Sequence, residues 1–125
     1  MNPENRERRK DKRYAVKERV LTSIRPIPEE TYHMLDISMG GMAFRYLGKG
    51  RRYNENILQG DLIFEGSGLT VKKLTFEIIS DQLMNGSFIP MRRCGVQFRN
   101  LSEAQHNYLQ QFIARTKINT APGPA

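Results

Sequence analysis

Cysteine is nearly absent from this chain of 125 residues, in which Cys94 is the only one. An intrachain disulfide is therefore impossible, and nothing in the sequence asks for an oxidising compartment. No apolar stretch approaches the roughly 20 residues that a membrane-spanning helix needs, and the basic start is not followed by the apolar segment of a secretory signal. We therefore expect a soluble, cytoplasmic protein without membrane contact.

Groupings of residues that support catalysis or bind metal ions are also lacking. His33 and His106 are isolated, no cluster of His, Cys and Asp has metal-ligand spacing, and no nucleophile has an evident base. Cys94 alternates with apolar residues and is expected to be a small core residue. The sequence therefore predicts neither an enzyme nor a protein that carries a metal or a cofactor.

Positive charge is abundant near the N-terminus. The formal net charge is +7, and residues 1–25, with nine basic and four acidic side chains, contribute +5 of it. This concentration predicts attraction to polyanions through a localised contact rather than a broad duplex-binding face. Residues 1–13 contain almost no apolar side chain, so we expect them to form an arm that is mobile unless something binds it.

A chain of this length can bury one hydrophobic core. A single domain is therefore expected over residues 14–117, followed by a tail at 118–125 that is rich in Pro, Gly and Ala and should be disordered. Apolar and polar residues alternate along the domain, as they do in strands that are buried on one face. The segments with this pattern are 14–24, 31–37, 41–46, 57–66, 69–84 and 92–100.

The hydrophobic period changes towards the C-terminus. Ser102 followed by Gln105 forms a capping-box pattern, and the apolar residues that follow have helical spacing, which predicts a helix over 103–116. Short strands followed by one helix favour an all-β fold with a C-terminal helix, a small antiparallel barrel. The interior of such a barrel is filled by side chains, so a ligand must bind on the outside.

The segment "DISMGG" places chemistry at the end of a predicted strand. Asp36 and Ser38 are two residues apart, so their side chains point to the same face, and Gly41 lets the backbone turn sharply beneath them. A carboxylate then lies beside a hydroxyl on a rigid element. The alternative is an Asx or Ser turn that satisfies local backbone amides.

The basic arm contains two arginines at a spacing of four. Arg9 and Arg13 fall on one side of the arm whether it is helical or extended. A guanidinium pairs with phosphate oxygens, bonds the O6/N7 edge of guanine and stacks on a base. In isolation, the alternative interpretation is a solvated basic tail.

In combination, the two segments resemble the PilZ domain family, and the resemblance covers about residues 7–115. Arg-x-x-x-Arg precedes the first strand, and Asp-x-Ser-x-x-Gly follows at a strand end. The matching residues are Arg9, Arg13, Asp36, Ser38 and Gly41. This resemblance implies a six-stranded antiparallel β-barrel that is a receptor for the bacterial second messenger cyclic di-GMP.

The resemblance also implies a role for each motif residue. The arm arginines would hold the phosphates and guanine edges of the ligand, Asp36 and Ser38 would hold a guanine, and Gly41 would permit their turn. Arg8 lies directly before the motif, and an arginine there accompanies binding of a stacked ligand pair in that family. Ligand would order the arm against the barrel and create a surface for a downstream protein partner. The protein would be a monomer or a ligand-dependent dimer.

Two alternatives remain open from the residues alone. One is a general nucleic-acid-binding barrel that uses the basic segments 48–52 and 92–93 together with the arm, with Tyr46 or Tyr53 for stacking. The other is a ligand-independent interaction module that shares the fold. The aromatic residues lie mainly at core positions, so we expect no nucleic-acid binding, and the two intact motifs argue against a ligand-independent module.

Overall fold

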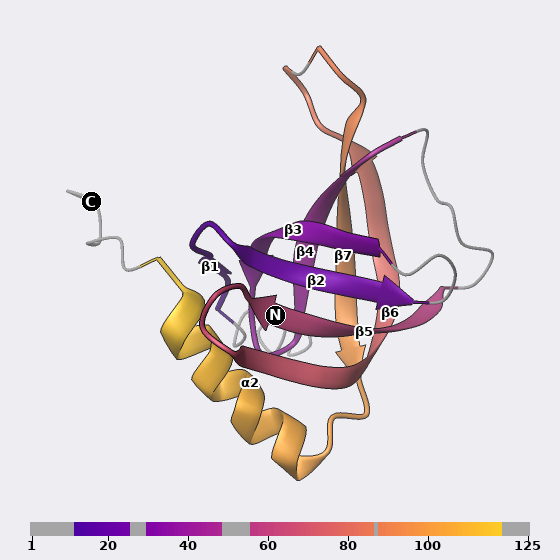
Figure 1. The fold of residues 1–125 in the computed structure, drawn as a ribbon. Helices are drawn as coiled ribbons and strands as arrows, with labels where there is room; N and C mark the ends of the chain where they lie inside the picture. The colour runs from indigo at the N-terminus through magenta and orange to yellow at the C-terminus, as the bar shows by residue number, and fades with distance from the viewer. Residues whose placement is uncertain (1–11, 26–29, 49–55, 87, 119–125) are drawn as a thin grey trace, which may run out of the picture.

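The computed structural model describes residues 12–25, 30–48, 56–86 and 88–118, and the structural statements below concern these residues. The chain is mostly β-structure with one helix towards the C-terminus (Figure 1). The elements are β1 (Tyr14–Ala15), β2 (Val20–Arg25), β3 (Glu30–Ile37), β4 (Gly41–Leu47), β5 (Ile57–Phe64), β6 (Leu69–Leu83), β7 (Met91–Arg99) and α2 (Glu103–Thr116). None of the described helices is long and apolar enough to cross a membrane.

Six of the strands close into an antiparallel barrel. The sheet runs in the order β3-β2-β5-β6-β7-β4, and β4 pairs again with β3. The short strand β1 lies on the same edge of β3 as β2, and it pairs with β3 beyond Leu21, the first β2 residue that pairs there. The predicted six-stranded barrel with a C-terminal helix is confirmed.

Side chains of alternating strand residues fill the barrel. On β4, Met42, Phe44 and Tyr46 are buried while Arg45 and Leu47 are exposed. The same alternation on the other strands brings apolar side chains into one core, which stabilises the fold by removing apolar surface from water. The outward positions of the strands are therefore the ones available to a ligand.

The predicted strand over 14–24 is interrupted. β1 ends at Ala15 and β2 begins at Val20, and Arg19 between them has a φ of 68°. Val16 and Val20 are nevertheless buried, so the alternation identified the core positions but not the break. Because β1 pairs with residues 36–37 of β3 and β2 with residues 30–33, residues 34–35 have no partner on that edge.

Helix α2 has the predicted bounds, and its capping box is present. The Ser102 hydroxyl accepts from Gln105 N at 3.0 Å, and Gln105 Oε1 accepts from Ser102 N at 2.9 Å. The C-terminal end of α2 is tied to the start of the domain. Lys17 N donates to Thr116 O at 2.8 Å, and Ile118 N donates to Ala15 O at 2.8 Å. Of the tail predicted at 118–125, residues 119–125 lie outside the described residues.

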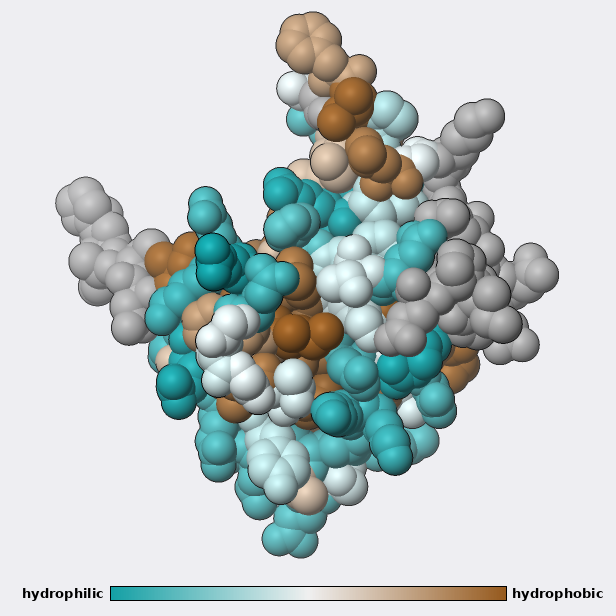
Figure 2. Space-filling model, in the orientation of Figure 1, coloured by the Kyte–Doolittle hydropathy of each residue, from teal (hydrophilic) through white to brown (hydrophobic). Residues whose placement is uncertain are grey.

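Strands β6 and β7 continue past the barrel as a projecting hairpin. β6 pairs with β5 only from Leu69 to Glu77, whereas the strand itself continues to Leu83. The end of the hairpin carries exposed apolar side chains, including Phe88, and appears brown at the top of Figure 2. At its base the Tyr46 hydroxyl donates to Asp81. Burial, reinforced by this hydrogen bond, raises the pKa of Tyr46 above its ordinary value.

Candidate functional site

The turn between β3 and β4 is built by Ser38. Its backbone N–H donates to Gly41 O at 2.8 Å, and its hydroxyl accepts from the N–H groups of Gly40 and Gly41 at 3.1 Å. Ser38 is 5% exposed. The structure thus shows the local Ser turn that the sequence left open as an alternative, and the hydroxyl fixes the shape of this corner of the barrel.

Gly41 is required by a close approach of two strands. A Cβ at this position would lie 2.1 Å from Val96 O on β7. The φ of Gly41 is not positive, unlike that of four other described glycines. We expected Gly41 to permit a sharp turn, but the restriction comes from the neighbouring backbone of β7, which leaves no room for a side chain.

Asp36 provides the carboxylate of the site. It lies near the end of β3, opposite Ala15 of β1 on one edge and Ala43 of β4 on the other. Its Oδ2 accepts from Arg93 Nη2 of β7 at 2.6 Å, and the side chains of Asp36 and Arg93 are 19% and 34% exposed. The carboxylate is therefore ion-paired while part of its surface still meets solvent.

A second guanidinium lies beside this ion pair. Arg45 of β4 is the cross-strand neighbour of Arg93, and the next outward pair along the two strands is Ala43 with Gly95. Arg45 is exposed and makes no ion pair with any described residue. This outward face of β3, β4 and β7 thus combines one carboxylate and two guanidinium groups around a strip of small residues, which suits a polar anionic ligand.

The end of the arm joins the barrel next to Asp36. Arg13 is exposed and directly precedes β1, whose Ala15 pairs with Asp36. Next to Arg13, the ring of Tyr14 has Lys12 Nζ 5.5 Å and Lys117 Nζ 4.7 Å from its centre. The structure therefore brings the end of the arginine motif to the strand end that carries the carboxylate.

The six predicted site residues are not all described. Of those that are described, Asp36 lies near the end of β3, Ser38 in the turn that follows, Gly41 at the start of β4 and Arg13 directly before β1. Arg8 and Arg9 lie outside the described residues, as does most of the arm that we expect to be mobile.

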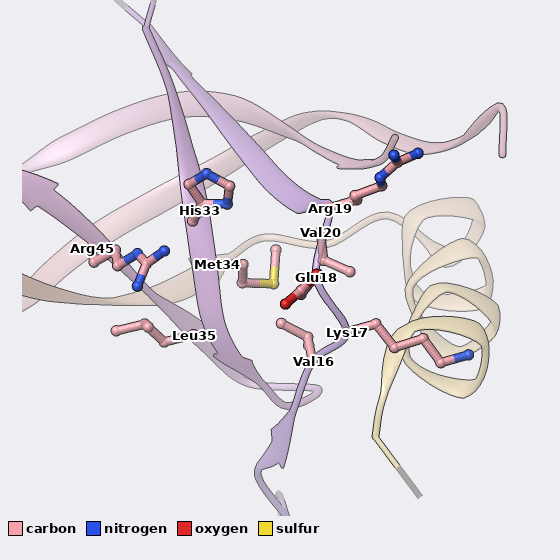
Figure 3. A pocket seen from close by; sticks show the side chains of 9 residues that line it. All are labelled: Val16, Lys17, Glu18, Arg19, Val20, His33, Met34, Leu35 and Arg45. Atoms are coloured by element: carbon pink, nitrogen blue, oxygen red, sulfur yellow. The ribbon is translucent and has the colours of Figure 1, made fainter. Parts of the chain in front are cut away.

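A hollow of about 440 Å³ borders this site along β3 (Figure 3). It lies where residues 34–35 of β3 have no paired strand on the edge towards β1 and β2. Its lining is partly apolar, because it includes the buried side chains of Val16, Val20 and Met34. Glu18 lies over the centre of the view, so the hollow is not uniformly cationic. The residues that line it are Val16, Lys17, Glu18, Arg19, Val20, His33, Met34, Leu35 and Arg45.

Arg45 and Arg93 are residues of this site that were not predicted from the sequence, and Arg93 is the one that contacts Asp36. From the sequence, residues 92–93 stand out only as a basic segment that could bind nucleic acid. In the structure these two arginines point to different partners, because Arg92 Nε donates to Asp81 at 2.8 Å whereas Arg93 binds Asp36. The alternation of β7 places Arg93 on the outer face, but its partner follows only from the pairing of β7 with β4 and of β4 with β3. Among the described residues, no group of His, Cys, Asp and Glu could hold a metal ion.

Comparison with protein families and known proteins gives two results. The family model of the PilZ domain matches residues 7–115. No curated protein sequence matches the chain.

Several solved structures share the fold. MrkH of K. pneumonia in complex with c-di-GMP superposes with a TM-score of 0.68 at 13% identity, over 83% of this chain and 50% of that one. YcgR of Escherichia coli in complex with c-di-GMP gives 0.61 at 20% identity, over 86% and 45% of the two chains. PlzA of Borreliella burgdorferi in complex with c-di-GMP gives 0.59 at 10% identity, over 88% and 55%. The chain spans about half the length of these proteins.

Proposed function

Because this chain belongs to the PilZ domain family, we propose that it is a receptor for cyclic di-GMP. The observation that carries the proposal is the pairing of Ala15 with Asp36, since it supports a common site for Arg13, the end of the arginine motif, and the Asp36 carboxylate. The three structures of the same fold named above were determined with c-di-GMP bound. The proposal applies to this chain, whatever else the longer proteins do.

The chemistry of the site agrees with this ligand. The Asp36 carboxylate suits the N1–H and N2–H donors of a guanine, which face an acceptor in one plane. Arg13, together with Arg9 of the arm, supplies guanidinium groups for the phosphates and for the O6/N7 edge of a base. Ser38 and Gly41 hold the corner of the barrel in the shape that presents Asp36. In this proposal Arg8 determines whether one ligand molecule or a stacked pair binds.

The proposed output is a change in the arm. Before binding, its cationic side chains repel one another, and the ligand phosphates would provide charge-assisted hydrogen bonds that order the arm against the barrel. The ordered arm and the ligand would then form a new surface, to which a downstream protein partner binds. No catalytic step is part of this proposal.

Titration calorimetry with cyclic di-GMP tests the function and the site. We expect Arg13→Ala and Asp36→Ala each to weaken binding about tenfold or more, which is the loss of one charge-assisted hydrogen bond. Arg99→Ala is the matched control, because Arg99 lies on β7 like Arg93 but pairs with Glu77 of β6, outside the site. The molar ratio of ligand to wild-type protein tests the role of Arg8.

Two outcomes would contradict different parts of the proposal. Equal affinity for the wild type and both site variants would reject the residue assignment while leaving the receptor function in place. Absence of binding by the folded wild type would reject the function itself, and binding of any single-stranded RNA with steep salt dependence would favour the nucleic-acid alternative.

A further inference from the structure

The carboxylate of the proposed ligand site is held by an arginine that belongs to neither sequence motif. Arg93 Nη2 donates to Asp36 Oδ2 at 2.6 Å, and the two residues are 57 positions apart in the sequence. Asp36 Oδ1 makes no hydrogen bond with any described residue. The barrel thus engages one oxygen of the carboxylate, and no described residue engages the other.

The sheet explains why Arg93 reaches Asp36. Arg93 lies on β7 and Asp36 on β3, and β4 runs between them. On β4, Ala43 pairs with Asp36 on one side and with Gly95, two residues after Arg93, on the other, and it is buried. Arg45, the cross-strand neighbour of Arg93, carries a like charge, and a pair of like charges in this position is unfavourable. The carboxylate of Asp36 compensates part of that repulsion.

We propose that Arg93 is a positioning residue that sets the selectivity of the site for guanine. This inference rests on the proposed function. A carboxylate on its own rotates about its terminal torsion, which is broad. Arg93 fixes Oδ2, so that Oδ1 points in one direction and accepts from a guanine donor at low entropic cost.

This role predicts discrimination between two ligands that share a ring of phosphates and sugars. Guanine presents the N1–H and N2–H donors to an acceptor, whereas adenine presents the unprotonated N1 at the same position, and a carboxylate oxygen repels its lone pair. Contacts to the phosphates are common to cyclic di-GMP and cyclic di-AMP. An oriented Asp36 therefore affects the ratio of the two affinities, and a purely electrostatic effect of Arg93 would change both affinities together.

The experiment measures the affinities of cyclic di-GMP and cyclic di-AMP for the wild type, Arg93→Gln, Arg93→Lys and Arg99→Gln. We expect Arg93→Gln to weaken cyclic di-GMP binding about tenfold and cyclic di-AMP binding by less than about twofold. Arg93→Lys keeps the charge without the planar fork and should recover part of the selectivity. Arg99 lies on β7 like Arg93, and Arg99→Gln breaks its ion pair with Glu77 of β6. This variant should change neither affinity.

The possible results separate this inference from the proposed function. Equal weakening of both ligands by Arg93→Gln would overturn the positioning role, and tighter binding of cyclic di-GMP would overturn it too, because Arg93 would then compete with the ligand. Thermal unfolding of each variant establishes that it is folded, and if Arg93→Gln does not fold, the Arg93→Lys comparison decides. If the wild type binds neither ligand, the proposed function is rejected. If the wild type binds cyclic di-GMP and every variant has the same ratio of the two affinities as the wild type, this inference alone is rejected.

Discussion

Gly41 lies where β4 passes close to β7, with Val96 O 2.1 Å from the position that a Cβ would take. Gly60 on β5 is in the same situation away from the site, since its Cβ would lie 2.0 Å from Ser23 O. We expect Gly41→Ala and Gly60→Ala each to lower the free energy of unfolding by about 1 to 3 kcal/mol, because backbone atoms must move to admit the methyl group. Urea denaturation measures both. Unchanged stability of Gly41→Ala would mean that the role of Gly41 in the motif is not the close approach.

At the same scale, the sequence identified the motif residues but not their partners. Asp36 and Ser38 are predicted to act together because two residues at a spacing of two share a face of a strand. One interpretation was that Ser38 bonds the local backbone, and the structure shows this bond, while a contact of Ser38 with the ligand stays a prediction. Arg93 could not be assigned to Asp36 from the sequence, because the contact depends on the register of β7 with β4 and of β4 with β3.

Among the elements, the helix and most strands could be predicted because their signals are local. The capping box and helical spacing gave α2 with its observed bounds, and alternation gave β4 to within one residue. The break between β1 and β2 could not be predicted. It depends on the positive φ of Arg19, a position where no glycine indicates a turn. It also depends on two backbone hydrogen bonds to the C-terminal end of α2, in which Lys17 N donates to Thr116 O and Ala15 O accepts from Ile118 N.

Because β1 is anchored in the sheet, we expect hydrogen exchange to differ between the arm and the segment that follows it. β1 pairs with β3, and the segment that follows it is hydrogen-bonded to the end of α2, so the root of the arm is already held without ligand. In hydrogen exchange we expect cyclic di-GMP to increase the protection of residues 5–13 strongly and that of residues 14–17 only slightly. The control is Asp36→Ala at the same ligand concentration. Because this variant should bind the ligand more weakly, residues 5–13 should be protected less than in the wild type. Unchanged exchange of residues 5–13 at saturation would reject ordering of the arm as the output.

For the molecule as a whole, the charge is arranged so that attraction and recognition use different residues. Most of the net charge of +7 comes from the N-terminal 25 residues, yet the contacts proposed for the ligand need only Arg8, Arg9 and Arg13 from the arm. The remaining basic residues of the arm include Lys10 and Lys12. Charges that do not touch a ligand still raise its rate of encounter, because the field of the protein extends over the Debye length.

The double variant Lys10→Gln/Lys12→Gln tests this division of roles. We expect its association rate with cyclic di-GMP to fall about two- to threefold at low ionic strength, and its dissociation rate to stay unchanged, because steering acts before contact. The difference should disappear at high salt. Lys72→Gln/Lys73→Gln is the control, since these exposed lysines of β6 lie beside the start of α2, where their carbonyl groups accept from Gln105. Stopped-flow fluorescence with a labelled ligand gives both rates. A faster dissociation of the arm variant would show that the lysines contact the ligand, and the separation of attraction from recognition would then be wrong.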